Sequence, residues 1–501
     1  MIIRKIVVST LFVIGVITTC CSKKFPEISQ DSIIARIGNR VITKNEFIRR
    51  AEYTPRPAYC RGDYYIHKKI ILNTLIAEKL YAIEAEKSKS PLLTNSNFNN
   101  YLTGRKEQAM RQWHYYLLSY SRIKLTKEEL NDFYENSLRK YKLNYYTFTD
   151  TAVFNELIGY GTINNEIFER VFYDHLRGDS IPYMELELNM VTDPDVIFKI
   201  YSRKYNKGEI IGPIRISYRS FIIFRVMGWT TTIPIDERSR AAHMQEVERF
   251  LKLYKADKHY SQIVKRIMQG KRIEFNRDIF LTIAQRVSDL YLNIDKKSEL
   301  NRALWDLEVK AAPDSIQGLF DDIIDEPLFN IDNRAWTVKE FKELLEKHPL
   351  VFRKRRFKNS EYLEQLKYAI VDLVRDYYIT QDAYRRGYDR IESVNHNVQM
   401  WKDNLLAIDQ RNRILNKKNL LDDFKQDYIS IIDTVLNPYF LSLIKKYENE
   451  IEINTYILEN IKLTRVDMSV LQTGLPYPVV VPNFPVLTTY NRLDYGKKMA
   501  N

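Results

Sequence analysis

The residues best suited to acid–base or metal chemistry are histidines, and they are spread over the whole chain of 501 residues. They are His67, His114, His175, His243, His259, His348 and His396. Their spacing does not match that of metal ligands, and no His-Glu-x-x-His pair occurs. The chain also lacks a glycine-rich phosphate loop and the Gly-x-Ser-x-Gly turn of serine hydrolases. The sequence therefore predicts no metal site, no cofactor, and neither hydrolase nor nucleotide chemistry.

The cysteines predict attachment of a lipid rather than a disulfide framework, because the chain has only three. Two basic residues precede an apolar run from Ile6 to Thr19, which is too short to span a bilayer but fits the core of an export signal. The run ends at Cys20 and Cys21. This pattern resembles a bacterial lipoprotein signal, in which cleavage precedes a cysteine whose thiol carries the lipid.

Cys20 is the favoured lipid-bearing residue and Cys21 is the alternative, because Thr19 departs from the small residue usual before that cysteine. An ordinary cleaved signal followed by two chance cysteines is the competing interpretation. The residue two places after Cys20 is not aspartate. The resemblance therefore implies a periplasmic protein anchored by lipid to the outer membrane of a Gram-negative-type bacterium. One disulfide stays open, between Cys21 and Cys60.

The composition indicates a large, helix-rich, basic chain. It is 45% hydrophobic and 28% charged, which is compatible with two to four domains. The 77 basic residues exceed the 64 acidic ones, a formal balance of +13 that could favour anionic lipid or acidic clients. The charges are interspersed, as on solvated helices, and no nucleic-acid-binding module accompanies them. The 35 tyrosines against 15 glycines indicate helices with adaptable aromatic surface.

A short pattern occurs twice, beginning at Ile37 and again at Ile331. Both copies place Ile, Asn, Arg, Thr, Glu and Phe in the same register, and similar helical stretches follow at 75–85 and 373–383. In each copy Asn-Arg forms a turn, and Thr-x-x-Glu has the capping-box spacing that satisfies free N–H groups at a helix start. Each copy therefore predicts two short strands, a capped helix and a long helix, and together they indicate an internal duplication.

Between the two copies the hydrophobic period changes from helical to alternating. Strands are predicted at 143–149, 184–191, 207–216 and 220–226, with helices at 164–177 and 194–205. Residues 143–230 are therefore predicted to form a small α+β unit inserted into a mainly α-helical protein.

Four segments resemble those of SurA-type and PrsA-type periplasmic foldases, in the same order. They are the Ile-Asn-Arg-Thr-x-x-Glu-Phe block after Ile37, the helix opening Leu125-Thr-Lys-Glu-Glu-Leu130, the turn Lys207-Gly-Glu-Ile-Ile-Gly-Pro213 and the strand Phe221-Ile-Ile-Phe-Arg-Val226. The resemblance covers roughly residues 33 to 280. It implies helical SurA-N-like chaperone modules, here duplicated, and an inserted parvulin-type peptidyl-prolyl isomerase domain.

Isomerase activity is expected to be weak or absent. Rotation of an X-Pro bond needs a pocket that holds the proline and weakens the double-bond character of the amide. Parvulin-type domains place two histidines there, on the first and last strands. The first strand here has none, and Ile222 stands at the matching place on the last, so no catalytic residue is assigned. The candidate peptide-binding residues are Tyr218, Phe221, Ile222 and Phe224, although strand alternation would place some of them in the core.

The domain prediction has seven parts. They are a signal peptide at 1–20, a tether at 21–32, a helical chaperone module at 33–142, a degenerate parvulin-like domain at 143–230, a helical segment at 231–325 packing back on the first module, a second SurA-N-like module at 326–470 and a proline-rich tail at 471–501. Prolines exclude a helix in the tail. The tail is expected either to lie as a strap on its own domain or to dock a partner.

These patterns predict a membrane-tethered periplasmic chaperone that binds unfolded exported or outer-membrane polypeptides through aromatic side chains. Two alternatives stay open. One is a glycan-binding lipoprotein beside an outer-membrane transporter, which fits the lipid signal and aromatic content but leaves the Lys-Gly-Glu-x-x-Gly-Pro turn and the repeat unexplained. The other is a structural subunit of an assembly or secretion complex, which shares the predicted fold.

Overall fold

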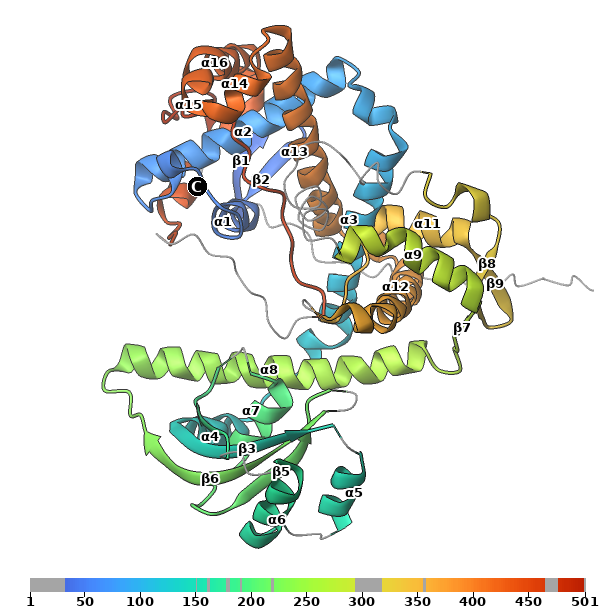
Figure 1. The fold of residues 1–501 in the computed structure, drawn as a ribbon. Coiled ribbons are helices and arrows are strands. Elements are labelled where there is room, and N and C mark those ends of the chain that lie inside the picture. The colour runs from blue at the N-terminus through green and yellow to red at the C-terminus, as the bar shows by residue number, and fades with distance from the viewer. Residues whose placement is uncertain are drawn as a thin grey trace, which may run out of the picture.

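A computed structural model describes residues 32–149, 151–159, 163–176, 181–189, 192–217, 220–292, 318–354, 357–464 and 476–499. Within these ranges the protein is mainly helical and contains three small sheets, as the sequence predicts (Figure 1). The long helix α8 (Glu237–Ile267) separates a large helical body from a smaller lobe. No helix of the described part is long and apolar enough to cross a bilayer. Cys20, Cys21 and the predicted signal lie outside the described residues.

The body begins with a hairpin followed by three helices. β1 (Ile33–Ile37) pairs antiparallel with β2 (Arg40–Thr43), and α1 (Lys44–Glu52), α2 (Tyr65–Lys87) and α3 (Ser96–Leu118) follow. Thr43 caps α1 by accepting a hydrogen bond from the backbone N–H of Glu46 at 3.0 Å. Most of α2 is buried, including the charged side chains of Glu78 and Lys79. Cys60 is also fully buried.

A second hairpin repeats the geometry of the first. β8 (Pro327–Ile331) pairs with β9 (Arg334–Thr337), and α11 (Val338–Lys347) and α12 (Tyr362–Arg385) follow. The cross-strand register is the same as in β1 and β2, including one irregularity near the start of the first strand. Asp332 and Asn333 both have positive φ, as a type I′ turn requires. Thr337 and Glu340 form the complete predicted capping box.

The smaller lobe consists of an antiparallel sheet with helices on both faces (Figure 1). Its elements are α4 (Lys127–Ser137), β3 (Arg139–Phe148), α5 (Thr151–Gly159), α6 (Asn165–Leu176), β4 (Tyr183–Leu186), α7 (Pro194–Tyr201), β5 (Ile210–Arg215) and β6 (Phe221–Thr231). The strand order is β4-β3-β6-β5, so the first and last strands of the lobe are central neighbours. Side chains of α5 and α6 cover one face, and those of α4, α7 and α8 cover the other.

The helices that pack on each hairpin are not the ones that the predicted domain boundaries assign to it. Within the described part of 231–325, α8 packs back on the first module, through Tyr260 against Tyr115 of α3. β7 (Glu274–Phe275) and α9 (Arg277–Leu292) join the second hairpin instead, where Val287 shares a core with Trp336. The predicted segment 231–325 is therefore divided between two cores. A periodic helix pattern shows which face is apolar but not which distant element covers it.

The C-terminal helices complete the first hairpin rather than a module at 326–470. They belong to the series α13 (Glu392–Lys417), α14 (Leu421–Gln426), α15 (Tyr428–Ile431), α16 (Asn437–Lys446), β10 (Ile451–Ile453) and α17 (Thr455–Glu459). β10 pairs antiparallel with β1, and Phe440 of α16 shares the core of Leu75. The first module is thus built from both ends of the described part of the chain.

The proline-rich tail is an extended strap on its own body over residues 476–499. Its two-residue strand β11 (Lys497–Lys498) pairs parallel with β10. Phe484 and Leu487 are buried in the core of the first module. The side-chain amide of Asn73 donates hydrogen bonds to the backbone oxygens of Tyr490 and Arg492, at 2.8 and 2.9 Å. These residues follow the strap alternative rather than that of a free docking arm.

Candidate functional site

The candidate peptide-binding residues on β6 do not form one surface. Phe221 is 1% exposed and shares a core with α5 and α6, whereas Phe224 is 0% exposed and lies in the core on the opposite face. Ile222 is half-buried on the same face as Phe224, and Tyr218 lies outside the described residues. Strand alternation therefore turns the two phenylalanines into core residues on opposite faces, which corrects their assignment to a peptide-binding surface.

The sheet face that carries Ile222 is covered by the protein's own side chains. Ile222 pairs across the sheet with Thr147 of β3, so neither of the two central strands offers an imidazole there. Ile197 of α7 and Phe250 of α8 belong to the core on this face. His175 is a residue of α6 and not of either of the two strands. The described lobe therefore holds neither the histidine pair nor an open apolar cradle on these strands.

A buried cluster of charged side chains is a second candidate, because perturbed ionisable groups often mark functional sites. It lies between β2, α1, α2 and α13 and consists of Arg40, Glu46, Arg50, Glu78, Lys79 and Asp403. Arg50 donates to both carboxylate oxygens of Glu78, at 3.0 and 2.7 Å. Lys79 Nζ donates to Glu46 at 2.9 Å and lies 3.4 Å from Asp403. Three cations thus face three carboxylates in the interior.

The pKa values in this cluster follow from burial and pairing. Burial alone would raise the pKa of Glu46, but Lys79, His396 and Arg50 together outweigh it and lower that pKa to about 2. Burial raises the pKa of Asp403 despite its cationic neighbours. Arg50 also donates to the backbone oxygen of Asn483 in the strap, at 3.0 Å. Because the side chains are enclosed and hold α1, α2 and the strap together, we interpret the cluster as architectural.

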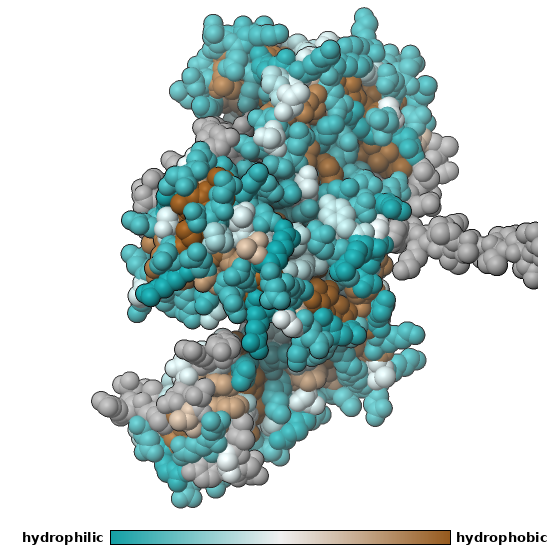
Figure 2. Space-filling model, turned by 90° about the vertical axis from the view of Figure 1, so that its right-hand side faces the viewer, coloured by the Kyte–Doolittle hydropathy of each residue, from teal (hydrophilic) through white to brown (hydrophobic). Residues whose placement is uncertain are grey.

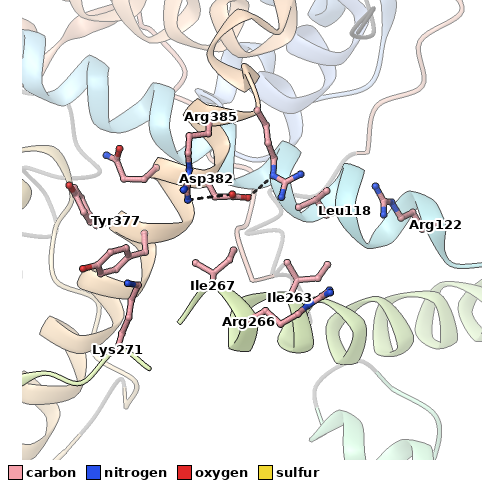
Figure 3. Close-up of a pocket in the computed structure, with 12 residues that line it drawn as sticks. Leu118, Arg122, Ile263, Arg266, Ile267, Lys271, Tyr377, Asp382 and Arg385 are labelled. Carbon is pink, nitrogen blue, oxygen red and sulfur yellow. Dashed lines mark hydrogen bonds and ion pairs between the residues drawn. The ribbon is translucent and has the colours of Figure 1, made fainter. Parts of the chain in front are cut away.

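The strongest candidate is a groove of about 790 Å³ between the body and α8 (Figure 3). Its lining residues come from α3, from the turn after it, from α8 and its following turn, and from α12. They are Leu118, Arg122, Ile263, Arg266, Ile267, Lys271, Tyr377, Tyr378, Gln381, Asp382, Arg385 and Arg386. Three helices therefore end at this groove, because α3, α8 and α12 terminate at Leu118, Ile267 and Arg385.

The floor of the groove is apolar and aromatic. Ile263 and Ile267 of α8 project toward α12, and Tyr377 lies at one end (Figure 3). The Lys271 ammonium lies 4.3 Å from the ring centroid of Tyr378, which is a cation–π geometry. Because Ile263 and Ile267 carry no hydrogen-bonding groups, this part of the floor can contact apolar side chains of many shapes.

A hydrogen-bonded chain supports one wall of the groove. The Tyr260 hydroxyl lies 2.8 Å from His114 Nδ1, and His114 Nε2 lies 2.9 Å from Asp382. Burial, together with the nearby Arg386, lowers the pKa of His114 although Asp382 acts to raise it. A neutral imidazole would then accept from Tyr260 and donate from Nε2 to Asp382. Burial would raise the pKa of Asp382, but hydrogen bonds from Arg386 and His114 lower it. Asp382 therefore stays ionised and holds α3 against α12.

The groove carries an excess of positive charge. Five cationic side chains line it against the single carboxylate of Asp382, which lies 2.5 Å from Arg386 and 3.5 Å from Arg385. Lys271 is paired with Asp332 at 2.5 Å. Two carboxylates thus offset two of the five cations. The three helix C-termini contribute roughly half a negative charge each. Three remaining cations exceed that sum of about 1.5 charges, so the groove stays positive.

Sequence reasoning missed this groove. Arg385 and Arg386 look like ordinary cations at a helix end, and Arg266 and Lys271 look the same. The one local signal is their place at or just after the end of a helix, where cations are common. Only tertiary packing brings α3, α8 and α12 to one place.

Comparisons with protein-family models, curated proteins and solved structures found no match to this chain. Among the described residues, no group of histidine, cysteine and acidic side chains has the geometry to hold a metal ion.

Proposed function

We propose that the protein is a periplasmic, membrane-tethered chaperone that binds unfolded exported or outer-membrane polypeptides, with weak or absent prolyl isomerase activity. The observation that carries the proposal is the open groove with an apolar, aromatic floor at the junction of the body and the lobe. Such a surface suits an extended chain, because apolar burial is non-directional and tolerates many sequences.

The arrangement of modules supports the same proposal. We propose that residues 143–230 are a degenerate parvulin-type domain and that the two hairpin modules arose by duplication. In a parvulin-type domain the site lies on the first and last strands, which must therefore be neighbours. The pairing of β3 with β6 at the centre of the sheet agrees with this requirement. The equal register of the two hairpins is what a duplicated segment would retain. The covered sheet face and the isoleucine at position 222 favour a holding role over catalysis.

Further apolar surface lies on the lobe. Ile233 and Ile235 are 72% and 96% exposed in the segment between β6 and α8, beside a second cavity of about 640 Å³. Figure 2 shows a largely hydrophilic surface with small separate hydrophobic patches, indented where the lobe meets the body. Several modest contact sites would let one client be held at more than one point, which raises the overall affinity without a single tight pocket.

The test measures aggregation of a urea-unfolded outer-membrane protein after dilution, with and without the full chain. Light scattering is expected to fall as the protein is added. The variant Ile267→Ser, which makes the groove floor polar, should weaken this protection by about threefold to tenfold. Leu363→Ser, at an exposed site near the start of α12, is the matched control and should leave protection unchanged. Equal scattering with and without the protein would contradict the proposal.

Isomerase activity has a separate test. A proline-containing tetrapeptide should exchange between cis and trans at its uncatalysed rate in the presence of the protein, because Ile222 cannot donate or accept a hydrogen bond at the bond being rotated. Binding of a defined oligosaccharide, with no effect on aggregation, would instead favour the glycan-binding alternative.

A further inference from the structure

We infer that the groove between α3, α8 and α12 selects client segments by their carboxylates, binding stretches in which Asp or Glu alternates with aliphatic or aromatic residues. This inference rests on the proposed chaperone function and specifies the class of client segment that the groove prefers. The groove combines an apolar floor with cationic side chains around it. A client segment that carries apolar and acidic side chains would contact the floor and the cations together.

The cations available to a ligand are those without a carboxylate of their own. Within the described ranges no carboxylate pairs with Arg122 or Arg266, and both side chains are exposed. Arg122 donates through Nε to the backbone oxygen of Leu117 at 3.0 Å, which leaves its terminal nitrogens for a ligand. Arg guanidinium groups bind carboxylates with two parallel hydrogen bonds, so each of these positions fits an acidic side chain.

The distribution of the cations favours an extended polypeptide over a single small anion. Figure 3 shows Arg122, Arg266, Lys271 and Arg385 spread around the groove rather than converging on one point. They come from the turn after α3, from α8 and its following turn, and from α12. One phosphate or carboxylate could meet only part of this set. Carboxylates along a chain, separated by apolar residues over Ile263 and Ile267, could meet the unpaired Arg122 and Arg266 and also lie near the paired Lys271 and Arg385.

The same geometry disfavours a lipid surface as the ligand. Cations that bind an anionic bilayer must reach a flat plane together. Here they border a hollow between helices, and the apolar residues lie on its floor rather than on a projecting face. An acidic, apolar polypeptide segment therefore fits this groove better than a bilayer does.

The experiment compares three labelled twelve-residue peptides with identical Leu and Tyr positions, in which the alternate residues are Glu, Gln or Lys. Fluorescence anisotropy with the full chain measures their affinities. The Glu peptide is expected to bind about threefold to tenfold more tightly than the Gln peptide, and the Lys peptide most weakly. The preference should shrink as salt is raised, because exposed ion pairs are screened.

The charge-reversed double variant Arg122→Glu/Arg266→Glu tests the groove itself. It should bind the Glu peptide no better than the Gln peptide, while its unfolding midpoint stays close to that of the parent. Arg249→Glu reverses an exposed arginine on the same helix, outside the groove, and should leave the preference intact. The neutral variant Arg122→Gln/Arg266→Gln, which introduces no repulsion, should show an intermediate loss.

Three results would overturn the inference. Equal affinities for the Glu and Gln peptides would remove the acidic preference, and the chaperone proposal would stand if both peptides bind and aggregation is suppressed. An equal loss in Arg249→Glu would assign the preference to overall charge. Binding to phosphatidylglycerol vesicles that depends on Arg122 and Arg266 and displaces the Glu peptide would identify a lipid site. Failure of the chaperone proposal is distinct, because aggregation would then be unaffected and no peptide would bind.

Discussion

His114 shows how burial decides the state of a single side chain. It is fully buried and bridges Tyr260 of α8 to Asp382 of α12. Burial lowers its pKa from the ordinary value of 6.5, although Asp382 acts in the opposite direction. His348 lies 2.6 Å from Glu107 in the joint between α3 and α11, and burial and the nearby Arg111 lower its pKa as well. Both histidines join α3 to the second module.

Stability is therefore expected to fall as the pH drops below 6.5, the ordinary pKa of histidine. The pKa of this histidine is lower in the folded protein than in the unfolded chain. As pH drops below 6.5, the unfolded chain therefore binds more protons than the folded protein does, and folding is disfavoured. Its contribution is complete above 6.5 and is lost as pH falls through the folded-state pKa. The lowered pKa values of Asp382 and Glu107 act in a separate window, below their ordinary 3.8 and 4.5.

Urea unfolding at several pH values measures this effect. His114→Asn removes the titrating group and should give a smaller fall in the free energy of unfolding over the same range. A variant with the same pH dependence as the parent protein would show that His114 is not one of the groups responsible.

At the scale of elements, the same Thr-x-x-Glu pattern is used in two ways. In α11 the Glu340 carboxylate accepts a hydrogen bond from the backbone N–H of Thr337 at 3.0 Å, which completes the capping box. In α1 the matching Glu46 turns inward, 2.9 Å from Lys79 and 2.9 Å from His396. The side chain of Glu46 is 1% exposed, against 28% for Glu340. Only the hydroxyl part of the box is retained at Thr43.

Matched substitutions should separate these roles. Glu46→Gln removes one partner of a buried ion pair and is expected to cost about 3 to 5 kcal/mol in the free energy of unfolding, because Lys79 stays buried with less compensation. Glu340→Gln, at a solvent-accessible cap, should cost about 1 kcal/mol or less. Urea denaturation measures both. Equal costs would contradict the assignment of Glu46 to the buried cluster.

At the scale of the whole molecule, the two hairpin modules are interleaved rather than arranged in sequence. The first contains β1, β10 and β11 in one sheet, so both ends of the described chain meet there. The second is closed by α9, and α3 packs against it closely enough that a Cβ on Gly104 would lie 1.9 Å from the backbone oxygen of Lys347. In chain order the lobe lies between the two hairpins, and α8 follows it. The body is therefore expected to unfold as one unit.

The C-terminal strap should be essential for that unit. Phe484→Ala empties a buried site in the first module and is expected to cost about 3 to 5 kcal/mol, the usual range for a core phenylalanine. Arg492→Ala, at an exposed position of the same strap, is the control and should change stability little. Thermal unfolding and limited proteolysis report both effects. A stable Phe484→Ala protein would mean that the strap is an appendage.

The elements of this protein are determined by local sequence. The hairpins follow from Asn-Arg turns, the helix starts from Thr43, Thr126 and Thr337, and the extended tail from its prolines, because each of these depends on neighbours a few residues away. The α+β lobe is equally local, since its change of hydrophobic period lies within 143–230.

Only the tertiary structure decided which distant elements share a core. Pairing of β1 with β10 and of α9 with the second hairpin, the covering of both sheet faces over Phe221 and Phe224, and the inward turn of Glu46 all depend on residues far along the chain. The groove also depends on tertiary packing. Its residues Leu118, Ile267 and Arg385 are each more than a hundred residues from the next in the sequence, and they meet where three helices end. Apolar burial is non-directional, so a periodic pattern specifies that a face must be covered and leaves its partner to the packing of the whole chain.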